Sequence, residues 1–380
     1  MVDGAYRTAF LDWLACAVGG GEEPAARAAR TLGDGMAERV AALGAAGHVL
    51  DYDDTHAPSL AHLSAPSAPA ALVLGAELGA GVGEVLRAYA AGLEAMGAVA
   101  AANHPGIRER GWHPTAVCGV VGAAVAGARL LALDPDRTEH AVRLALLRAG
   151  GLHAAFGSDG KALQVGMASA AGATAARLAA AGATAGPEVY AGFEAAFGAR
   201  WPADALEPGD RAIAGNWIKA YPCCLQTHGA IEAAARVRDE MGVPDGDIEV
   251  VVHPVSLETA WRTTVANGLE AKFSIPYLSA FTLLHGAPRL DAFRAVDQAA
   301  EAFAAERIVV RTDLTMLESE AAIEAGDERL ARVEAALGSP ARPMDEPALA
   351  AKVHELAGDR LDGALDDPER PAGEVLEALR

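Results

Sequence analysis

A concentration of side chains that can move protons lies in residues 48–66, HVLDYDDTHAPSLAHLSAP. Three acids, two histidines and several hydroxyl groups fall within residues 51–65, in a chain otherwise rich in alanine. Carboxylates and histidines together can act as general acids and bases. At helical spacing His48, Asp51 and Thr55 would share one face, and Pro58 would end the helix. We predict the active site here; the alternative is a solvated, capped helix end.

Two further polar motifs stand at predicted helix starts. In RGWHPT, residues 110–115, His113 precedes a proline where backbone N–H groups favour anions, although a structural histidine explains the motif equally well. In FGSDGKALQVG, residues 156–166, Lys161 follows a Gly/Ser turn and enters a helix. The turn lacks the spacing of a nucleotide-binding P-loop, so Lys161 belongs either to a weak anion site or to the exposed surface.

Two more motifs lie further along the chain. In KAYPCCLQTH, residues 219–228, the proline is expected to open a helix that brings Cys224 and His228 together at i, i+4 spacing. Such a pair could hold a thiolate nucleophile, but buried small cysteines are the preferred interpretation. In AKFSIPY, residues 271–277, Tyr277 is either an acid–base group or a packed aromatic with its hydroxyl satisfied.

The elements that must position these residues follow from hydrophobic periodicity. Amphipathic and Ala-rich patterns predict helices along almost all of residues 1–235, the expected large helical domain. The period then changes, because GDIEVVVHP and ERIVVRTD are β-branched runs, with RLARVEAAL an ambiguous third. Helical segments lie between them, so residues 236–342 are expected to form a smaller α+β domain. Residues 343–380 are expected to return as helices to the helical domain, and the fold class is mainly α.

Composition restricts the partners. The chain has 380 residues, of which 52% are hydrophobic and 5% aromatic, enough for a sizeable core. Its 31 basic and 51 acidic residues give a net charge of −20. Broad nucleic-acid binding is therefore not expected, because phosphate neutralisation needs a basic face. A small anionic substrate is compatible with this charge if a few cations converge locally.

The apolar runs and the cysteines indicate the expected cellular compartment of the protein. The first twenty residues begin acidic, and Asp12 interrupts their apolar run, so no signal peptide is expected. The apolar run over residues 116–128 is too short to span a membrane, and no membrane association is expected. The four cysteines lack the spacing of a disulfide scaffold, a zinc site or an iron–sulfur cluster. We expect a cytoplasmic protein without a metal site.

Five motifs in this order, LDYDDTH, ERGWHPT, FGSDGKALQVG, KAYPCCLQTH and AKFSIPY, resemble the MmgE/PrpD family. The likeness covers nearly the whole chain, including PMDEPALAAKV near the C-terminus. The family includes 2-methylcitrate dehydratases, cis-aconitate decarboxylases and an iminodisuccinate epimerase. The resemblance implies a large all-helical domain, a smaller α+β lid domain, a cleft between them and usually a homodimer. It also implies no required metal or organic cofactor.

The resemblance further implies a set of site residues. Catalytic positions fall on Asp51, His62, His113 and Tyr277, and substrate-binding positions fall on Thr55, Lys161, Lys219 and His228. Two departures bear on the substrate: Leu63 stands where the family usually has proline, and so does Ala162. The chain is also shorter than most relatives. These departures leave the family assignment intact and leave the substrate open.

The chemistries of this family begin with removal of a proton from a carbon next to a carboxylate. The step needs a positioned base, together with cations or hydrogen-bond donors for the developing charge. Lys161 and Lys219 could supply the positive charge. The candidates for proton transfer are His62, His113 and Tyr277. Asp51 is expected to orient or tune a histidine.

We therefore predict a cofactor-independent lyase, most simply a dehydratase or hydratase, acting on a small di- or tricarboxylate. The closest alternative is an epimerase or isomerase of a small dicarboxylate that uses the same site, with two proton-transfer groups on opposite faces of one carbon. A decarboxylase ranks below it. The alternative from another class is a non-catalytic binding or assembly protein built on the same fold.

Overall fold

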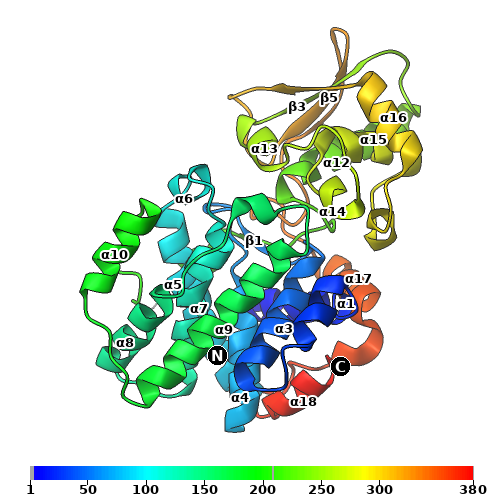
Figure 1. Cartoon of the computed structure of the whole chain (residues 1–380). Helices are drawn as coiled ribbons and strands as arrows, with labels where there is room; N and C mark the ends of the chain where they lie inside the picture. Colours follow the sequence, from blue (N-terminus) through cyan, green and yellow to red (C-terminus); the bar gives the residue numbers. More distant parts are fainter. Residues whose placement is uncertain (1–3, 208, 380) are drawn as a thin grey trace. The chain divides into compact units, whose positions relative to one another are not determined.

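The computed structural model describes residues 4–207 and 209–379, which form two compact units. Unit 1 contains the described residues up to Ala155, then 159–218 and 345–379, and unit 2 contains 156–158 and 219–344. Residues 219–235, assigned by periodicity to the helical domain, belong to unit 2. The chain leaves unit 1 briefly at residues 156–158 and again at 219–344, and its last helices belong to unit 1 (Figure 1).

Unit 1 is built almost entirely of helices. They are α1 (Gly4–Gly19), α2 (Pro24–Arg30), α3 (Met36–Val49), α4 (Ser64–Leu78), α5 (Val82–Ala102), α6 (Gly106–Glu109), α7 (Pro114–Leu130), α8 (Pro135–Leu146), α9 (Gly160–Ala180), α10 (Glu188–Phe197), α11 (Arg211–Ala214), α17 (Glu346–Ala357) and α18 (Ala372–Glu377). Two short strands, β1 (Thr55–His56) and β2 (Asn216–Trp217), pair antiparallel. Helices α3, α7 and α9, which carry or border the predicted site, lie together within this unit (Figure 1).

Small residues allow the central helix α7 to approach its neighbours closely. A Cβ atom placed on Gly92 of α5 would lie 2.3 Å from the carbonyl oxygen of Gly122 in α7. On the other side, a Cβ atom on Gly172 of α9 would lie 2.4 Å from the carbonyl oxygen of Val120. No side chain fits at such distances, because interiors are close-packed. The Ala- and Gly-rich composition therefore serves close helix packing.

Helices α3 and α9 also cross at glycines. A Cβ atom on Gly166 would lie 2.2 Å from the carbonyl oxygen of Ala41, and one on Gly44 would lie 2.9 Å from the Cα of Gly166. On α3 the crossing lies about one turn before His48, and on α9 it lies about one turn after Lys161. The spacing of these two helices therefore controls how their polar side chains meet.

We expect Gly166→Ala to lower the free energy of unfolding by about 2 kcal/mol, because the added methyl group forces α9 away from α3. The matched control is Gly192→Ala in α10, where no other atom lies within 4 Å of the new Cβ. This control should raise stability by about 0.5–1 kcal/mol, because alanine favours helix over glycine. Urea denaturation measures both effects, and similar values for the two variants would contradict the close crossing.

Unit 2 contains a four-stranded sheet and helices that pack against it. Its elements are α12 (His228–Met241), β3 (Ile248–Val252), α13 (Pro254–Thr259), α14 (Gly268–Ala271), α15 (Ile275–His285), α16 (Gln298–Arg307), β4 (Ile308–Thr312), β5 (Ala321–Ala325) and β6 (Glu328–Val333). The strand order is β4-β3-β5-β6, with β3 parallel to β4 and the other pairs antiparallel. In register, Val250 lies opposite Val310 on one side and Ile323 on the other.

The alternation of β3 explains the core of unit 2. Ile248, Val250 and Val252 pack with residues of α12, including Val237, because alternate side chains of a strand share one face. Val251 packs on the other face with Met316 and Ala322. The predicted fold class, mainly α with a smaller α+β part, is confirmed.

One expectation about the acidic segment is wrong. Helix α3 ends at Val49, and Asp51 takes a positive φ of 52°, which stops the helix. Thr55 lies in β1, opposite Trp217 of β2. His48, Asp51 and Thr55 therefore do not share a helix face, because a pairing with a distant strand replaces the helical continuation.

A second expectation, for the Cys–His pair, is also wrong. Helix α12 begins at His228, and a short 3₁₀ turn, Leu225–Thr227, precedes it. Cys224 lies before this turn in an extended conformation. Cys224 and His228 are thus not i, i+4 neighbours on a helix, and the buried Cys224 packs in the core of unit 2. The preferred interpretation of this cysteine as a small packing residue accords with that position.

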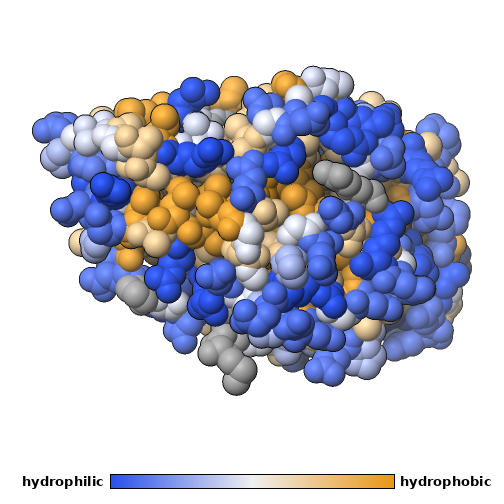
Figure 2. Space-filling view, turned by 90° about the horizontal axis from the view of Figure 1, so that it is seen from below, coloured by the Kyte–Doolittle hydropathy of each residue, from blue (hydrophilic) through white to orange (hydrophobic). Residues whose placement is uncertain are grey.

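Within the described residues, α5 is the one helix whose length and apolar composition would suit a membrane span. Of its most apolar 18-residue window, 67% is buried inside unit 1, as in the core helix of a globular protein. Figure 2 shows one face of the molecule, where hydrophilic residues dominate and apolar areas lie between them. Such a mixture is ordinary for a folded protein surface.

Candidate active site

The site loop, residues 51–62, leaves the end of α3 and is fixed at several points. Asp51 turns the chain with a left-handed backbone, a conformation that aspartate tolerates better than most residues. The side chain of buried Asp54 accepts hydrogen bonds from the backbone N–H of Ser64 (3.2 Å) and from Asn216 Nδ2 (2.6 Å). These bonds join the loop to the start of α4 and to β2.

The C-terminal helix α17 holds the loop from another side. Lys352 is buried, and its Nζ lies 2.5 Å from Asp12 Oδ1 of α1. The same ammonium group donates a hydrogen bond to the carbonyl oxygen of Tyr52 (2.8 Å) and lies 4.0 Å from the centre of the Tyr52 ring. Tyr52 stands between Asp51 and Asp53 in the sequence, so this contact fixes the backbone from which both aspartates extend.

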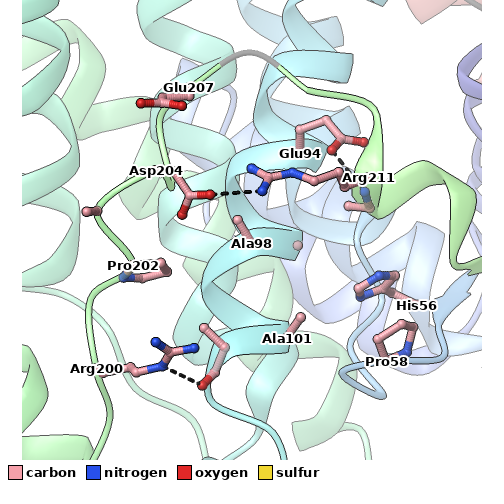
Figure 3. Close-up of a pocket in the computed structure, with 14 residues that line it drawn as sticks. His56, Pro58, Glu94, Ala98, Ala101, Arg200, Pro202, Asp204, Glu207 and Arg211 are labelled. Carbon is pink, nitrogen blue, oxygen red and sulfur yellow. Dashed lines mark hydrogen bonds and ion pairs between the residues drawn. The ribbon is translucent and has the colours of Figure 1, made fainter.

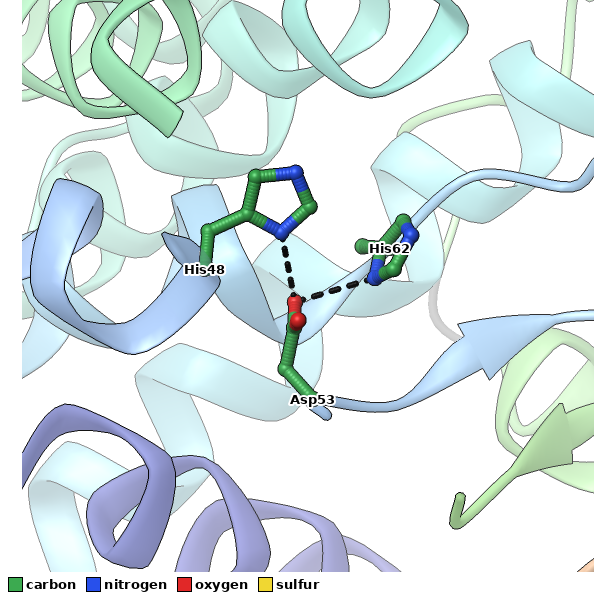
Figure 4. A group of neighbouring side chains, drawn as sticks. All are labelled: His48, Asp53 and His62. Atoms are coloured by element: carbon green, nitrogen blue, oxygen red, sulfur yellow. Dashed lines mark hydrogen bonds and ion pairs between the residues drawn. The ribbon is translucent and has the colours of Figure 1, made fainter. Parts of the chain in front are cut away.

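Asp53 connects two histidines through a single oxygen atom (Figure 4). Its Oδ2 lies 2.9 Å from Nδ1 of His48 and 3.0 Å from Nδ1 of His62. The two imidazole rings meet edge to face, with their centres 4.5 Å apart. All three side chains are buried. A carboxylate oxygen accepts hydrogen bonds, so both Nδ1 atoms face an acceptor.

The environment of this trio controls ionisation. Burial alone would raise the pKa of Asp53, but the charges and hydrogen bonds of His48 and His62 hold it well below the usual value. Burial lowers the pKa of His48, although Asp53 opposes that shift. The trio therefore contains an ionised carboxylate; at His48, burial favours the neutral form and Asp53 favours the charged form.

The ligand atoms of His48, Asp53 and His62 lie within 4.8 Å of one another, the spacing that a metal site would need. Here both nitrogens approach the same carboxylate oxygen at hydrogen-bond distance. A metal ion bound here would displace the protons of both hydrogen bonds. It would have three protein ligands among the described residues. Two N–H···O hydrogen bonds, whose donors are the imidazole nitrogens, account for the two short contacts to Asp53 Oδ2.

Asp51 and Lys161 place opposite charges next to His62. Lys161 Nζ lies 2.6 Å from Asp51 Oδ1, and the same oxygen lies 3.6 Å from Nε2 of His62. Lys161 is in the first turn of α9 and is 6% exposed, so it is not an ordinary surface lysine. A buried cation near Nε2 of His62 could stabilise negative charge that develops on a substrate.

His113 completes the cluster from the N-terminus of α7. Its ring stacks on that of His48, with centres 6.0 Å apart, and its Nδ1 lies 2.7 Å from Gln164 Nε2. Burial lowers the pKa of His113 well below the usual value, and nearby His48, Lys161 and His62 lower it further. His113 is thus neutral near pH 7 and can act as a hydrogen-bond donor or acceptor without carrying charge.

The structure brings four of the predicted residues into one buried cluster: Asp51, His62, His113 and Lys161. Thr55 is buried in β1, and its hydroxyl has no hydrogen-bond partner within the described part of the chain. Asp53 and Gln164 were not among the predicted site residues. A signal for Asp53 exists in hindsight, since it is an acid between two histidines in the segment 48–62.

The remaining predicted residues belong to unit 2. Lys219 and His228 are buried, and the His228 ring lies 5.1 Å from the ring of Tyr221. The hydroxyl of Tyr277 accepts a hydrogen bond from the backbone N–H of Asp297 (2.9 Å), and its ring packs in a core cluster of unit 2. That geometry matches a packed aromatic with a satisfied hydroxyl. Participation of these three residues in the same site stays a prediction.

A separate cavity of about 480 Å³ lies in unit 1 between α5, the segment after α10, and α11 (Figure 3). Four of its charged groups already have polar partners. Arg211 forms an ion pair with Asp204 (2.8 Å), and Arg200 Nε donates to a backbone carbonyl of α5. Glu94 accepts two backbone N–H bonds at the start of α11, from Ala212 and Ile213. Most of the charged groups that line this cavity are therefore already engaged within the protein.

The buried carboxyl of Asp54 gives a prediction about pH. Burial raises its pKa to about 7, although hydrogen bonds from Ser64 and Asn216 oppose the shift. In the unfolded chain the pKa of aspartate is about 3.9, so the native state binds this proton more tightly. The resulting stabilisation is complete below about pH 4 and is lost as pH rises through about 7.

Asp54→Asn cannot titrate, so between pH 5 and pH 8 it should lose less stability than the wild type, by on the order of 2 kcal/mol. Urea denaturation of both proteins at the two pH values measures the difference. Equal losses would show that Asp54 is already ionised at pH 5.

The protein thus has two units, one mainly helical and one α+β. The helical unit holds a buried cluster of histidines, aspartates and a lysine, which is a candidate acid–base site. Residues 38–201 match the family model described as MmgE/PrpD N-terminal domain, and residues 221–377 match the MmgE/PrpD C-terminal domain. The chain belongs to the MmgE/PrpD family.

Curated relatives of this chain carry the name cis-aconitate decarboxylase. The human protein is 27% identical over 270 residues, which cover 66% of this chain and 56% of that protein. The cis-aconitate decarboxylase-like protein oryM of Aspergillus oryzae is 31% identical over 252 residues, 59% of this chain and 48% of that protein. The chain thus spans about half the length of the curated relatives it matches. The family includes enzymes such as these.

Proposed function

We propose that the protein is a cofactor-independent lyase that acts on a small di- or tricarboxylate, with dehydration or hydration as its reaction. The observation that carries the proposal is the contact between Asp51, Lys161 and His62 in a buried setting. It combines a candidate base with a cation that could bind the carboxylate of the substrate. An acidic protein needs such a local cation to attract an anion.

In the proposed dehydration, the C–H bond next to a carboxylate breaks and its proton passes to Nε2 of His62. The electron pair moves toward the carboxylate, where Lys161 stabilises the added charge. It then forms the carbon–carbon double bond as the C–O bond breaks. The departing hydroxide takes the proton from His62 and leaves as water. His113, being neutral, would donate a hydrogen bond to a substrate oxygen.

Decarboxylation is the second candidate, favoured by the names of the relatives. Loss of carbon dioxide also leaves an electron pair on carbon next to an acceptor group. His62, after taking up a proton from solvent on Nε2, would then deliver that proton to the carbon. The same cluster could serve both reactions, because each has an intermediate with negative charge that Lys161 can stabilise. Epimerisation would need a second proton-transfer group on the opposite face of the carbon.

Proton NMR in D₂O with a panel of polycarboxylates tests the proposal. The panel contains 2-methylcitrate, citrate, cis-aconitate, malate, tartrate and iminodisuccinate. A vinylic signal arising from a hydroxy acid supports a dehydratase, and loss of carbon dioxide from cis-aconitate supports the second candidate. Deuterium at an α-carbon without a new skeleton points to an epimerase. Silence across the panel contradicts the substrate class.

A further inference from the structure

The chemistry of three neighbouring histidines depends on which ring nitrogen carries the proton. His48, His62 and His113 all lie in the buried cluster, with His48 between the other two by ring contact. A neutral imidazole has one donor nitrogen and one acceptor nitrogen, and its hydrogen-bond partners select between them. The partners of these rings therefore determine which nitrogen can accept a proton from a substrate.

Asp53 determines which ring nitrogen of His62 carries the proton. Its Oδ2 can only accept hydrogen bonds when the carboxylate is ionised, so the Nδ1 atom of His62, at 3.0 Å, keeps its proton. The same argument applies to His48 at 2.9 Å. In both rings the nitrogen that gains or loses a proton is then Nε2. At His62 this atom is the one that lies 3.6 Å from Asp51 Oδ1, beside Lys161.

Gln164 determines which ring nitrogen of His113 carries the proton, and the result is the opposite of that at His62. Its Oε1 accepts from the backbone N–H of Leu152 (2.9 Å), and its Nε2 donates to the carbonyl oxygen of Leu152 (3.2 Å). A flipped amide would place two acceptors together and two donors together, so this orientation is fixed. The amide nitrogen therefore donates to His113 Nδ1 at 2.7 Å. His113 then carries its proton on Nε2.

We propose that Asp53 and Gln164 are positioning residues that hold His62 and His113 in opposite tautomers. His62 presents a proton-accepting Nε2, and His113 presents a proton-bearing Nε2. The inference rests on the proposed function, because it assigns the base to His62 and the neutral hydrogen-bond donor to His113. The two acids thus differ in their partners: Asp53 is buried beside two histidines, whereas Asp51 pairs with Lys161.

The charged and titratable groups around His62 belong to several elements. They are Asp51 and Asp53 of the site loop, His48 of α3, Lys161 of α9 and His113 at the start of α7. Of these, Asp53 is the one that contacts Nδ1 of His62 at hydrogen-bond distance. The tautomer should therefore respond to replacement of Asp53 and not to replacement of Asp54, which bonds to Ser64 and Asn216.

Long-range ¹H–¹⁵N NMR of the full chain, labelled at histidine and free of substrate, reads the tautomers directly. Signals are assigned with single histidine variants. We expect protonated Nδ1 in His48 and His62, and protonated Nε2 with unprotonated Nδ1 in His113. An Nδ1-protonated His113, or a neutral His62 protonated on Nε2, would overturn the proposal. Because no turnover is needed, this result is independent of whether the proposed substrate class is correct.

Asp53→Asn tests the role in function. Asparagine keeps the shape of the side chain but removes the charge and replaces one of the two acceptor oxygens by a donor NH₂ group. We expect kcat/KM to fall by about 10²–10⁴-fold, mainly through kcat, and the tautomer of His62 to become mixed. The matched control is Asp54→Asn, an equally buried neighbour that bonds to Ser64 and Asn216 instead of a histidine. Its histidine tautomers should match the wild type.

Gln164→Glu provides the reverse test at His113. A carboxylate next to Nδ1 should accept a hydrogen bond from it and convert His113 to the Nδ1-protonated tautomer. An unchanged His113 spectrum in this variant, or unchanged His62 tautomer and kcat in Asp53→Asn, would refute the assignment of positioning roles. If either variant does not fold, the wild-type spectrum alone decides the question.

Discussion

Lys161→Met is expected to lower kcat/KM by about 10³-fold on the polycarboxylate that the protein turns over. Methionine retains the length and apolar stem of lysine but cannot bind a carboxylate or stabilise charge on it. Lys161 is the cation that contacts Asp51 at 2.6 Å next to His62, so its loss removes the positive charge at the proposed reaction centre. Steady-state kinetics measure the effect, and circular dichroism checks that the fold is retained.

The matched control for Lys161 is Arg177→Met on the same helix. Arg177 lies near the other end of α9, where its half-exposed side chain pairs with Glu77 (3.2 Å). Its replacement should leave kcat/KM within about twofold of the wild type, because surface ion pairs contribute little. Near-normal turnover by Lys161→Met would refute the proposed function, whatever the control shows.

His62→Gln is expected to have the other large effect, a fall in kcat of about 10³-fold or more. Glutamine can still form hydrogen bonds but cannot take up a proton. Exchange of the substrate α-proton with D₂O should therefore disappear together with turnover. This exchange separates loss of the base from loss of substrate binding, because a bound substrate without a base keeps its proton.

His140→Gln is the matched control for His62. His140 lies in α8, where its Nδ1 contacts backbone groups of Ala185. It belongs to the same unit but to no part of the cluster, so exchange and turnover should persist. If His62→Gln still exchanged the α-proton at the wild-type rate, the base would have to be a different residue.

Sequence patterns predicted the architecture well, because helix and strand periods are local properties. The change from helical to β-branched periodicity near residue 240 anticipated β3 and β4, and RLARVEAAL overlaps most of β6 (Glu328–Val333). Strand β5, AAIEA, was not predicted. Its alanines have no strand preference of their own, and the segment is a strand because β3 and β6 pair with it on both sides.

The site was predicted less completely, for a related reason. Residue types and helix starts indicated His113 and Lys161, whose positions depend on local caps and turns. The role of Asp53 depends on the fold of the loop, in which β1 pairs with a strand about 160 residues later. Local periodicity assigned the start of that loop to a helix and gave no sign that Asp53 contacts both His48 and His62. Contacts between distant segments leave no periodic trace in the sequence.

The contact between Lys352 and Tyr52 has a consequence for protein synthesis. Asp12 and Tyr52 leave the ribosome early, but Lys352 follows about 300 residues later. At roughly 5–20 residues per second, the wait lasts tens of seconds. During this time the buried carboxylate of Asp12 lacks its cation, and the surface that α17 later covers is open. The nascent N-terminal part should therefore bind chaperones until α17 emerges, and the site loop should reach its final form only when Lys352 is in place.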